Sequence, residues 1–238
     1  MNNVQALLFD VGGTIFDWKN TVRERLQELA GAEAETIDSE AFANDWRSEM
    51  FTIHRLVRQG DLPWMDSDEM HFRALESLAA THPFLKSIDH LTLVESTWHK
   101  LKPFAGASEA VDRLRTKFTV IVLTILSWKS IVKSSKRAGI NWDGILSCEL
   151  LGYYKPSLQA YLKGVNLLGL QPAEAMMVAA HEGDLAAAQA AGLKTALVSV
   201  PEEDSVDEGF GQQAATAFDV AAGDFQALCL QLGVTKGY

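Results

Sequence analysis

The chain opens with a short apolar segment that is typical of a buried strand. Residues 4–9 are almost continuously hydrophobic, and the run ends at Asp10, with Gly12 and Gly13 close behind. Buried parallel strands show this pattern of unbroken apolar residues followed by a turn of small residues. We therefore predict a strand over residues 4–9, with Asp10 at its carboxyl end.

The next segment, from about residue 18 to residue 101, has helical periodicity instead. Apolar residues recur three or four positions apart, as at Phe42 and Trp46 and again at Leu75 and Leu78, with charged residues between them. No strand-like run interrupts this pattern. The segment therefore predicts a helical subdomain inserted after the first strand.

Strands and helices alternate again after Pro103. Such alternation predicts a parallel, doubly wound sheet of the Rossmann-like α/β class, in which crossover helices join the strands. A polar surface loop is expected over 201–213. The apolar runs predict strands over 118–124, 145–148, 175–180 and 194–200, and the helical stretches are expected over 107–116, 128–138, 157–168, 184–192 and 223–232.

The predicted organisation is one α/β core with one insertion. The core comprises residues 1–16 and 102–238, and the helical cap subdomain comprises residues 17–101. Ligands of open parallel sheets bind at the carboxyl ends of the strands. We therefore expect the core and the cap to enclose a cleft at that edge of the sheet.

Several polar residues are expected at this edge. Asp10, Thr124 and His181 follow predicted strands, and the loop around Lys155 also lies there. An aspartate in this place either caps a turn or acts as a covalent nucleophile, which splits a difficult displacement into two easier steps. Lys155 is either a solvated surface residue or, if it faces Asp10, the charge that orients the carboxylate and keeps it ionised.

Three more candidates have both a structural and a functional interpretation. Asp184 begins a predicted helix, where it either complements the helix dipole or pairs with Lys155. The Thr14 hydroxyl either contacts a ligand or satisfies groups of its own loop. Arg47 follows Trp46 on a helix of the insertion, where an arginine is usually solvated. The five histidines of the insertion show no ligand-like clustering, and no role is assigned to them.

Composition and charge narrow the class of protein further. The chain has 238 residues, of which 47% are hydrophobic, and a formal net charge of −10, which together argue against disorder and against sequence-independent binding to nucleic acid. No apolar run approaches the length of a membrane span, and the first residues lack a basic leader. Cys148 and Cys229 are far apart and lack the spacing of a metal site, so we expect both to be reduced thiols. We expect a soluble cytoplasmic protein with a small-molecule substrate.

Four segments, taken in order, resemble the motifs of the haloacid dehalogenase superfamily. They are FDVGGTIFD with Asp10, the strand-end Thr124, YYKPS with Lys155, and AAHEGDLAAAQAAG with Asp184. The helical insertion after the first motif fits the same family, and the resemblance covers essentially the whole chain. It implies that Asp10 is the nucleophile and that Thr124, Lys155 and Asp184 support it.

Most members of that superfamily are magnesium-dependent phosphatases, and two of their groups are missing here. Gly12 replaces the acid two residues after the nucleophile, and Ala180 replaces the metal-binding acid of the last motif. Transfer of a phosphoryl group loses its main electrostatic support without them. The resemblance therefore implies the branch of 2-haloacid dehalogenases, which need no metal or other cofactor.

Two further positions match that branch. Arg47 stands where the cap supplies a halide-binding arginine, and Tyr161 stands where the family has an active-site tyrosine. The implied reaction is attack by Asp10 on C2 of a 2-haloalkanoate, which releases halide and leaves an ester on the enzyme. Lys155 and its partner aspartate would then help water to release a 2-hydroxy acid, while the substrate carboxylate is bound near Thr124.

Four positions depart from the pattern of that branch. Gly12, Ile125, Ala179 and His181 stand where the family has a tyrosine, an asparagine, a serine and an asparagine. The changes remove an amide that contacts the halide in the family. His181 or Trp128 could supply a different donor, and His181 is counted among the expected substrate-binding residues.

Three functions remain open on the sequence alone. The first is a cofactor-free 2-haloacid dehalogenase, for which the family suggests a homodimer. The second is an atypical magnesium-dependent phosphatase, with Glu182 or water in place of the missing ligands. The third is a non-catalytic relative that binds a small carboxylate or a protein partner. A buried cluster of Asp10, Lys155 and Asp184 would argue against the third, because a mere binder has no need of it.

Overall fold

The computed structural model describes residues 3–200 and 218–235. The polar loop expected over 201–213 therefore lies outside the described residues. Within the described part of the chain, no helix is both long and apolar enough to cross a lipid bilayer.

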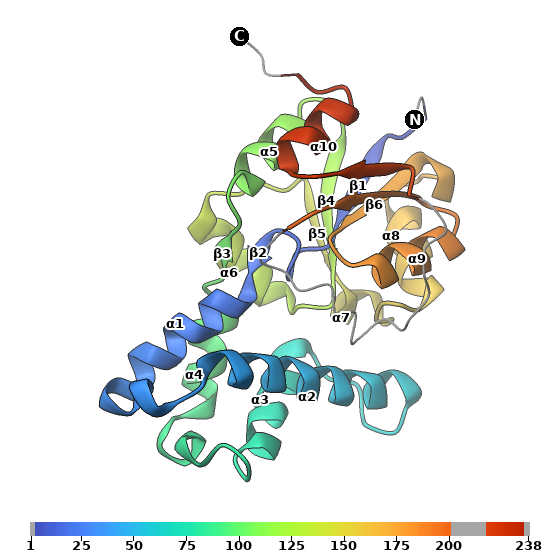
Figure 1. Ribbon diagram of the computed structural model, residues 1–238. Coiled ribbons are helices and arrows are strands. Elements are labelled where there is room, and N and C mark those ends of the chain that lie inside the picture. Colours follow the sequence, from blue (N-terminus) through green and yellow to red (C-terminus); the bar gives the residue numbers. More distant parts are fainter. Residues whose placement is uncertain (1–2, 201–217, 236–238) are drawn as a thin grey trace.

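Six parallel strands form the central sheet (Figure 1). They are β1 (Ala6–Phe9), β4 (Thr119–Thr124), β5 (Gly144–Ser147), β6 (Ala175–Ala179), β7 (Lys194–Val198) and β8 (Val220–Ala222). Their order is β5-β4-β1-β6-β7-β8, so that β1 lies in the middle and the chain winds outward from it in both directions. The doubly wound α/β fold is thereby confirmed.

The central strand is buried on both faces, which explains its continuous apolar sequence. Leu7 and Phe9 belong to one hydrophobic cluster, whereas Ala6 and Leu8 belong to a second cluster on the opposite face. Helices α5, α6 and α10 contribute to the first cluster, and α8 and α9 to the second. The flanking helices are α5 (Ala107–Leu114), α6 (Trp128–Ala138), α8 (Leu158–Leu167), α9 (Glu182–Ala190) and α10 (Phe225–Gln231), and the connections include α7 (Cys148–Leu151) and η3 (Pro172–Glu174).

The insertion forms a group of helices beyond the carboxyl ends of the strands (Figure 1). They are α1 (Trp18–Ala30), α2 (Ser39–Gln59), α3 (Ser67–Leu78) and α4 (His90–Trp98), with the short 3-10 helices η1 (Gly31–Thr36) and η2 (Pro83–Ser87) between them. Each α-helix begins after an aspartate whose carboxylate accepts a backbone N–H, and this cap fixes where the helix starts. The capping residues are Asp17, Asp38, Asp66 and Asp89.

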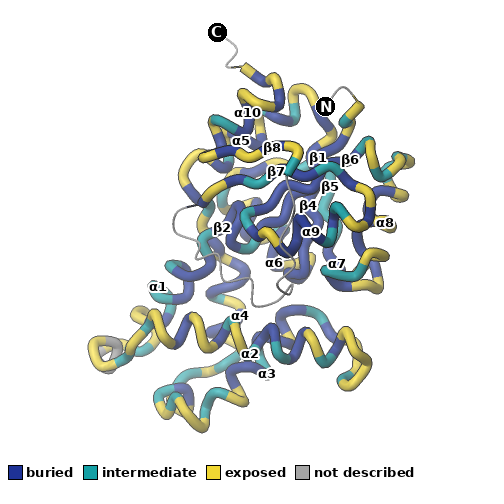
Figure 2. Tube along the Cα trace, turned by 45° about the vertical axis from the view of Figure 1, so that its right-hand side comes forward, coloured by how far each residue is buried: buried dark blue, intermediate teal, exposed yellow. Residues whose placement is uncertain are grey.

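The chain leaves and re-enters the core through a small antiparallel ribbon. Strand β2 (Phe16–Asp17) pairs with strand β3 (Lys102–Pro103). The boundaries expected between core and cap fall at this ribbon. The burial pattern is shared by the two regions: strands and inward helix faces are buried, and exposed residues gather on the outer turns (Figure 2). The ribbon thus anchors both ends of the insertion beside β1.

Candidate active site

Asp10 lies directly after β1, at the centre of the carboxyl edge of the sheet. Its backbone N–H donates to the carbonyl of Val178 on the neighbouring strand at 3.0 Å. Its Oδ2 accepts a hydrogen bond from Thr14 Oγ1 at 2.8 Å, and Thr14 Oγ1 in turn accepts the N–H of Ala180 at 3.0 Å. Backbone and side chain are therefore both fixed by the two strands that meet here.

Lys155 joins Asp10 to a second buried carboxylate. Its Nζ lies 3.1 Å from Asp10 Oδ1 and 2.7 Å from Asp184 Oδ2, and the lysine side chain is fully buried. The other oxygen of Asp184 accepts the hydroxyl hydrogen of Tyr161. The interpretation of Lys155 as a solvated surface residue is therefore wrong, and Asp184 pairs with it rather than merely complementing a helix dipole.

The charges in this cluster keep Asp10 ionised. Burial alone would raise the pKa of Asp10, but Lys155, His181 and Thr14 outweigh burial and hold that pKa well below its usual range. Burial opposes the charge of Lys155, yet Asp10 and Asp184 raise the pKa of the lysine. Burial raises the pKa of Asp184, and the charge of Lys155 acts in the opposite direction. Asp10 thus faces its surroundings as a carboxylate beside a protonated lysine.

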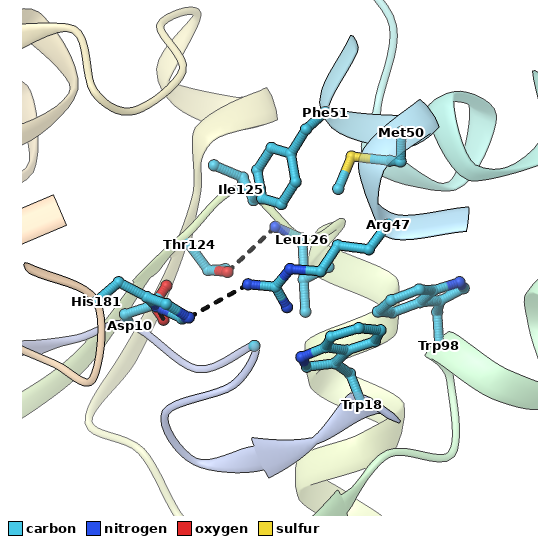
Figure 3. A pocket seen from close by; sticks show the side chains of 11 residues that line it. Asp10, Trp18, Arg47, Met50, Phe51, Trp98, Thr124, Ile125, Leu126 and His181 are labelled. Carbon is cyan, nitrogen blue, oxygen red and sulfur yellow. Dashed lines mark hydrogen bonds and ion pairs between the residues drawn. The ribbon is translucent and has the colours of Figure 1, made fainter. Parts of the chain in front are cut away.

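A small cavity opens next to Asp10, between the core and the insertion (Figure 3). Its volume is about 30 Å³. The wall is mostly apolar and aromatic, with a few polar side chains, as is usual for small-ligand sites. The lining residues are Asp10, Gly12, Trp18, Arg47, Met50, Phe51, Trp98, Thr124, Ile125, Leu126 and His181.

Arg47 reaches this cavity from helix α2 of the insertion (Figure 3). Its guanidinium carbon lies 4.4 Å from the ring centroid of Trp18 and 5.3 Å from that of Phe51. Its Nη2 lies 3.2 Å from His181 Nε2 in the core. The sequence-based interpretation of Arg47 as a solvated helix residue is therefore wrong, because two aromatic rings and the histidine hold the guanidinium inside the cavity.

His181 connects Arg47 to Asp10. It follows β6 and precedes α9, and its Nδ1 lies 3.3 Å from Asp10 Oδ2. A guanidinium only donates hydrogen bonds, so Nε2 must be the acceptor of the contact with Arg47. The remaining nitrogen, Nδ1, is the one that faces the Asp10 carboxylate. His181 therefore lies between the guanidinium of the insertion and the carboxylate of the core.

Thr124 ends β4 and lines the cavity from the core side. Its Oγ1 accepts the backbone N–H of Leu126 at 3.1 Å, which leaves the hydroxyl hydrogen to donate. Gly12 lies opposite, where an added Cβ would approach Leu126 Cδ1 to 3.3 Å. A tyrosine at this position, as in the resembling family, would therefore require Leu126 to move. Trp128, the alternative donor, is 45% exposed and does not line the cavity.

Two residues expected to bind substrate lie behind the cavity instead. Thr14 and Tyr161 are both fully buried, and neither lines the cavity. Their hydroxyl groups bind Asp10 and Asp184, respectively. In the structure these hydroxyl groups position the two carboxylates, and contact of either residue with substrate stays a prediction.

The described residues do not offer a fitting site for magnesium. They contain no group of three or more His, Cys, Asp or Glu side chains arranged to hold a metal ion. Ala180 has no ligand atom in its side chain, and Glu182 is exposed and does not line the cavity. Both oxygens of Asp184 already accept hydrogen bonds from within the protein. The donor set of a magnesium-dependent phosphatase is thus incomplete here.

The aromatic wall of the cavity was missed in the sequence. Met50 and Phe51 follow Arg47 by three and four positions, so the three side chains share one face of α2. This spacing was the available signal for them. Trp18 and Trp98 come from two other helices and meet in space with their rings stacked at 6.5 Å, which no local pattern could indicate.

Residues 4–192 match the family model of the haloacid dehalogenase-like hydrolases. The chain belongs to this hydrolase family. A solved structure of a defluorinating L-2-haloacid dehalogenase is 30% identical and has a TM-score of 0.87, with 96% of this chain and 95% of that chain covered. The resemblance to the L-2-haloacid dehalogenase branch is thereby confirmed.

Curated relatives of this hydrolase include two kinds of enzyme. (S)-2-haloacid dehalogenase 1 of Pseudomonas sp. (strain CBS-3) is 22% identical over 84% of this chain and 86% of its own length. Fructose-1-phosphate phosphatase YqaB of Escherichia coli (strain K12) is 24% identical over 79% of this chain and 93% of its own length. Identity at this level does not separate the two activities, so the substrate has to be argued from the site.

Proposed function

We propose that this hydrolase is a 2-haloacid dehalogenase, which converts a 2-haloalkanoate to a 2-hydroxy acid and halide without a metal or other cofactor. One observation carries the proposal. The ionised Asp10 lines a small, mostly apolar cavity that also contains a cation, the guanidinium of Arg47. A carboxylate nucleophile and a fixed cation for the leaving anion are the two groups that halide displacement needs.

The first step forms an ester on Asp10. A carboxylate oxygen of Asp10 attacks C2 of the substrate, and the carbon–halogen bond breaks with inversion at C2. Arg47 stabilises the departing halide, because its guanidinium is permanently charged and offers several N–H donors. Trp18 and Phe51 hold the guanidinium in place by their ring faces.

The substrate carboxylate is bound at the end of β4. Thr124 retains a hydroxyl hydrogen to donate there, and Ile125 and Leu126 line the same cavity. This placement puts C2 between the carboxylate-binding end and Arg47. The small volume of the cavity favours short substrates such as haloacetates and 2-halopropionates.

The second step hydrolyses the ester. Lys155 stays beside the ester oxygens as a cation and stabilises the negative charge that develops when water adds to the ester carbon. Asp184 keeps the lysine in place and protonated, and the Tyr161 hydroxyl holds Asp184. Collapse of the adduct releases the 2-hydroxy acid and restores Asp10.

The alternative function, suggested by the phosphatase among the curated relatives, is an atypical phosphatase. It is disfavoured by Gly12 and Ala180, which replace the general acid and a metal ligand, and by the exposed position of Glu182. A phosphoryl group is highly negatively charged. The lining of this cavity is mostly apolar and contains one arginine, Arg47, which is too little positive charge to neutralise it.

The test is halide release from chloro-, bromo- and fluoroacetate and from both enantiomers of 2-chloropropionate, with and without EDTA. We expect release that EDTA does not change and that Asp10→Asn abolishes. A panel of phosphate monoesters with magnesium is measured in parallel. Magnesium-stimulated phosphate release without any halide release would overturn the proposal.

A further inference from the structure

We propose that a groove between the carboxyl end of α2 and the loop before α8 binds the carboxylate of the 2-haloalkanoate before this substrate reaches the cavity, an inference that rests on the proposed dehalogenase reaction. That reaction makes the substrate a small anion. The groove has the size, the charge and the position to receive such an anion from solvent.

The groove lies on the seam between the insertion and the core. Its volume is about 450 Å³, compared with about 30 Å³ for the cavity beside Asp10. One wall comes from the insertion, between residues 57 and 64, and the other comes from the core, between residues 152 and 157. A haloacid of two or three carbons therefore fits into the groove together with part of its water.

Arg58 is the one charged side chain among the described residues that line this groove. It is exposed on the last turn of α2. Burial lowers the pKa of Arg58, Tyr161 opposes this, and the charge of Arg55 adds to it. Within the described chain, no carboxylate is among the groups that act on this guanidinium. A permanent charge that the protein leaves uncompensated can bind an anion from solvent.

The rest of the groove suits the organic part of such an anion. Trp64 is 47% exposed and stacks on Tyr154, with the ring centroids 4.5 Å apart. Tyr153 is also exposed, and Lys163 Nζ lies 5.7 Å from the centroid of its ring. These aromatic faces can contact the carbon chain and the halogen while Arg58 binds the carboxylate.

Local positive charge matters here because the chain as a whole repels anions. Its formal net charge is −10. Arg55, Arg58 and Lys163 place three cations at or beside the groove. Clustered charge of one sign raises the local concentration of the opposite ion and the rate at which it arrives. The groove is thus a place where an anionic substrate is attracted to an otherwise acidic protein.

One face of α2 joins the groove to the cavity. Arg47 and Phe51 point into the cavity from this helix (Figure 3). His54 and Arg58 follow Phe51 by three and seven positions, so they continue the same face toward the groove. The His54 ring lies edge-on to Phe51 at 5.9 Å and to Tyr154 at 5.0 Å. His54 therefore lies between a wall of the cavity and a wall of the groove.

His54 has the character of a boundary that can open. It is 1% exposed, and neither of its ring nitrogens has a hydrogen-bond partner among the described residues. A buried polar group without a partner destabilises the arrangement that buries it. If the ring turns toward the groove, its N–H can donate to a carboxylate that passes from Arg58 to Arg47.

The core side of the groove ends beside the catalytic cluster as well. Tyr154 and Pro156 line the groove, and Lys155 between them lies 3.1 Å from Asp10. An anion that leaves Arg58 along this seam therefore moves toward the two cations of the reaction, Lys155 and Arg47. The positive charges form a series that leads from the surface to the nucleophile.

The experiment follows the indole N–H signals of the six tryptophans in NMR spectra of the whole protein. Trp64 reports on the groove, Trp18 and Trp98 report on the cavity, and Trp128 lines neither. Lactate, a product of the proposed reaction that is not turned over further, is titrated into wild type, and sodium chloride is titrated at equal ionic strength. We expect the Trp64 signal to shift with lactate and not with chloride, with a dissociation constant of its own.

Three variants assign the effect to Arg58. Arg58→Gln removes the charge, Arg58→Glu reverses it, and Arg137→Gln is the matched control, because Arg137 is exposed on α6 and does not line the groove. The Trp64 shift should disappear in both Arg58 variants and remain in the control, while Trp18 still shifts in all three. In Arg58→Gln, kcat/KM for a 2-haloacid should fall by about fivefold at low ionic strength and recover near about 1 M salt.

Several results would overturn the inference. They are a Trp64 signal that stays still while Trp18 shifts, an equal Trp64 shift with chloride, and a shift that survives in both Arg58 variants. Equal kcat/KM in wild type and both Arg58 variants at low ionic strength would overturn the uptake of substrate by the groove. Failure of the proposed function is distinguishable, because wild type would then release no halide from any 2-haloacid, whatever the groove binds.

Discussion

Two buried aspartates of this hydrolase have similar surroundings, but only one of them lines the cavity. Asp10 in the core and Asp68 on α3 of the insertion are 8% and 9% exposed at the side chain. Asp68 accepts hydrogen bonds from the hydroxyl groups of Ser127 and Ser130 and lies 2.7 Å from His99 Nε2. Each carboxylate therefore has hydroxyl donors and a histidine beside it, as well as a lysine.

The pKa does not separate the two residues. Burial would raise the pKa of Asp68, but His99 and Ser127 outweigh it and hold that pKa well below its usual range, as happens at Asp10. The difference lies on the remaining side of each carboxylate. Asp10 lines the cavity opposite Arg47, whereas Asp68 joins the insertion to the first turn of α6. A depressed pKa thus indicates a paired carboxylate, and only the cavity makes one of them a nucleophile.

The largest expected effect is the loss of the nucleophile. In Asp10→Asn, the amide keeps nearly the same shape but cannot displace halide, and halide release should fall by roughly 10⁴-fold or more. Circular dichroism checks that the variant is folded. Release within about tenfold of wild type would remove Asp10 from the mechanism.

The next effect concerns the cation of the cavity. Arg47→Lys keeps the charge but loses the planar fork and its stacking on Trp18 and Phe51. Halide release should fall by about 10² to 10³-fold, the usual cost of removing a donor at developing charge. Arg55→Lys is the matched control, because Arg55 is exposed on the same helix. Equal rates for the two variants would contradict the assigned role of Arg47.

The third prediction concerns Asp68, whose substitution is expected to change stability and not activity. Asp68→Asn should leave halide release close to wild type and lower the free energy of unfolding by about 2 kcal/mol, because hydrogen bonds to a charged group are lost. Urea unfolding measures the stability and a halide electrode measures the activity. A variant that is stable but inactive would show that Asp68 has a role in the reaction.

The smallest effect is a pH dependence that originates in the insertion. Burial and Arg58 lower the pKa of His54 to about 3, and burial followed by Arg47 lowers the pKa of His71 to about 3 although Asp68 opposes this. The unfolded chain binds these protons near the ordinary histidine pKa, and the folded chain does not. Stability is therefore expected to fall on acidification below that value, by about 1.4 kcal/mol per pH unit for each histidine.

The check is urea unfolding of wild type and His54→Phe at several pH values between about 7 and 5. A phenylalanine keeps the edge-on contacts with Phe51 and Tyr154 and cannot bind a proton. The slope of stability against pH should therefore be shallower in the variant. Identical slopes would mean that His54 does not contribute. Asp10 and Asp68 have lowered pKa values in the folded chain, so their own losses begin only below the usual carboxyl pKa.

The core was more predictable from the sequence than the insertion. A strand such as β1 is apolar on both faces, so its position can be predicted from the local sequence alone. Lys155 and Asp184 could be assigned because ordered motifs place them at the same sheet edge as Asp10. Strands β2, β3 and β8 have two or three residues each, which is too short for any periodicity to show.

Contacts between the two regions could not be predicted. Arg47 and His181 are 134 positions apart, and an apolar helix face looks the same whether it covers a core or a cavity. His99 was given no role because its partner Asp68 and the two serines come from distant segments. Such pairs are set by the docking of helices, which leaves no local signal in the sequence.

The central claim is that Asp10 attacks the substrate and that water attacks the resulting ester. The most direct test is a single turnover with enzyme in excess over a 2-haloacid, in water enriched in oxygen-18 and containing EDTA. The account predicts that the heavy oxygen enters the side chain of Asp10 and that the 2-hydroxy acid carries the ordinary isotope. Heavy oxygen in the hydroxy acid, with Asp10 unlabelled, would contradict it.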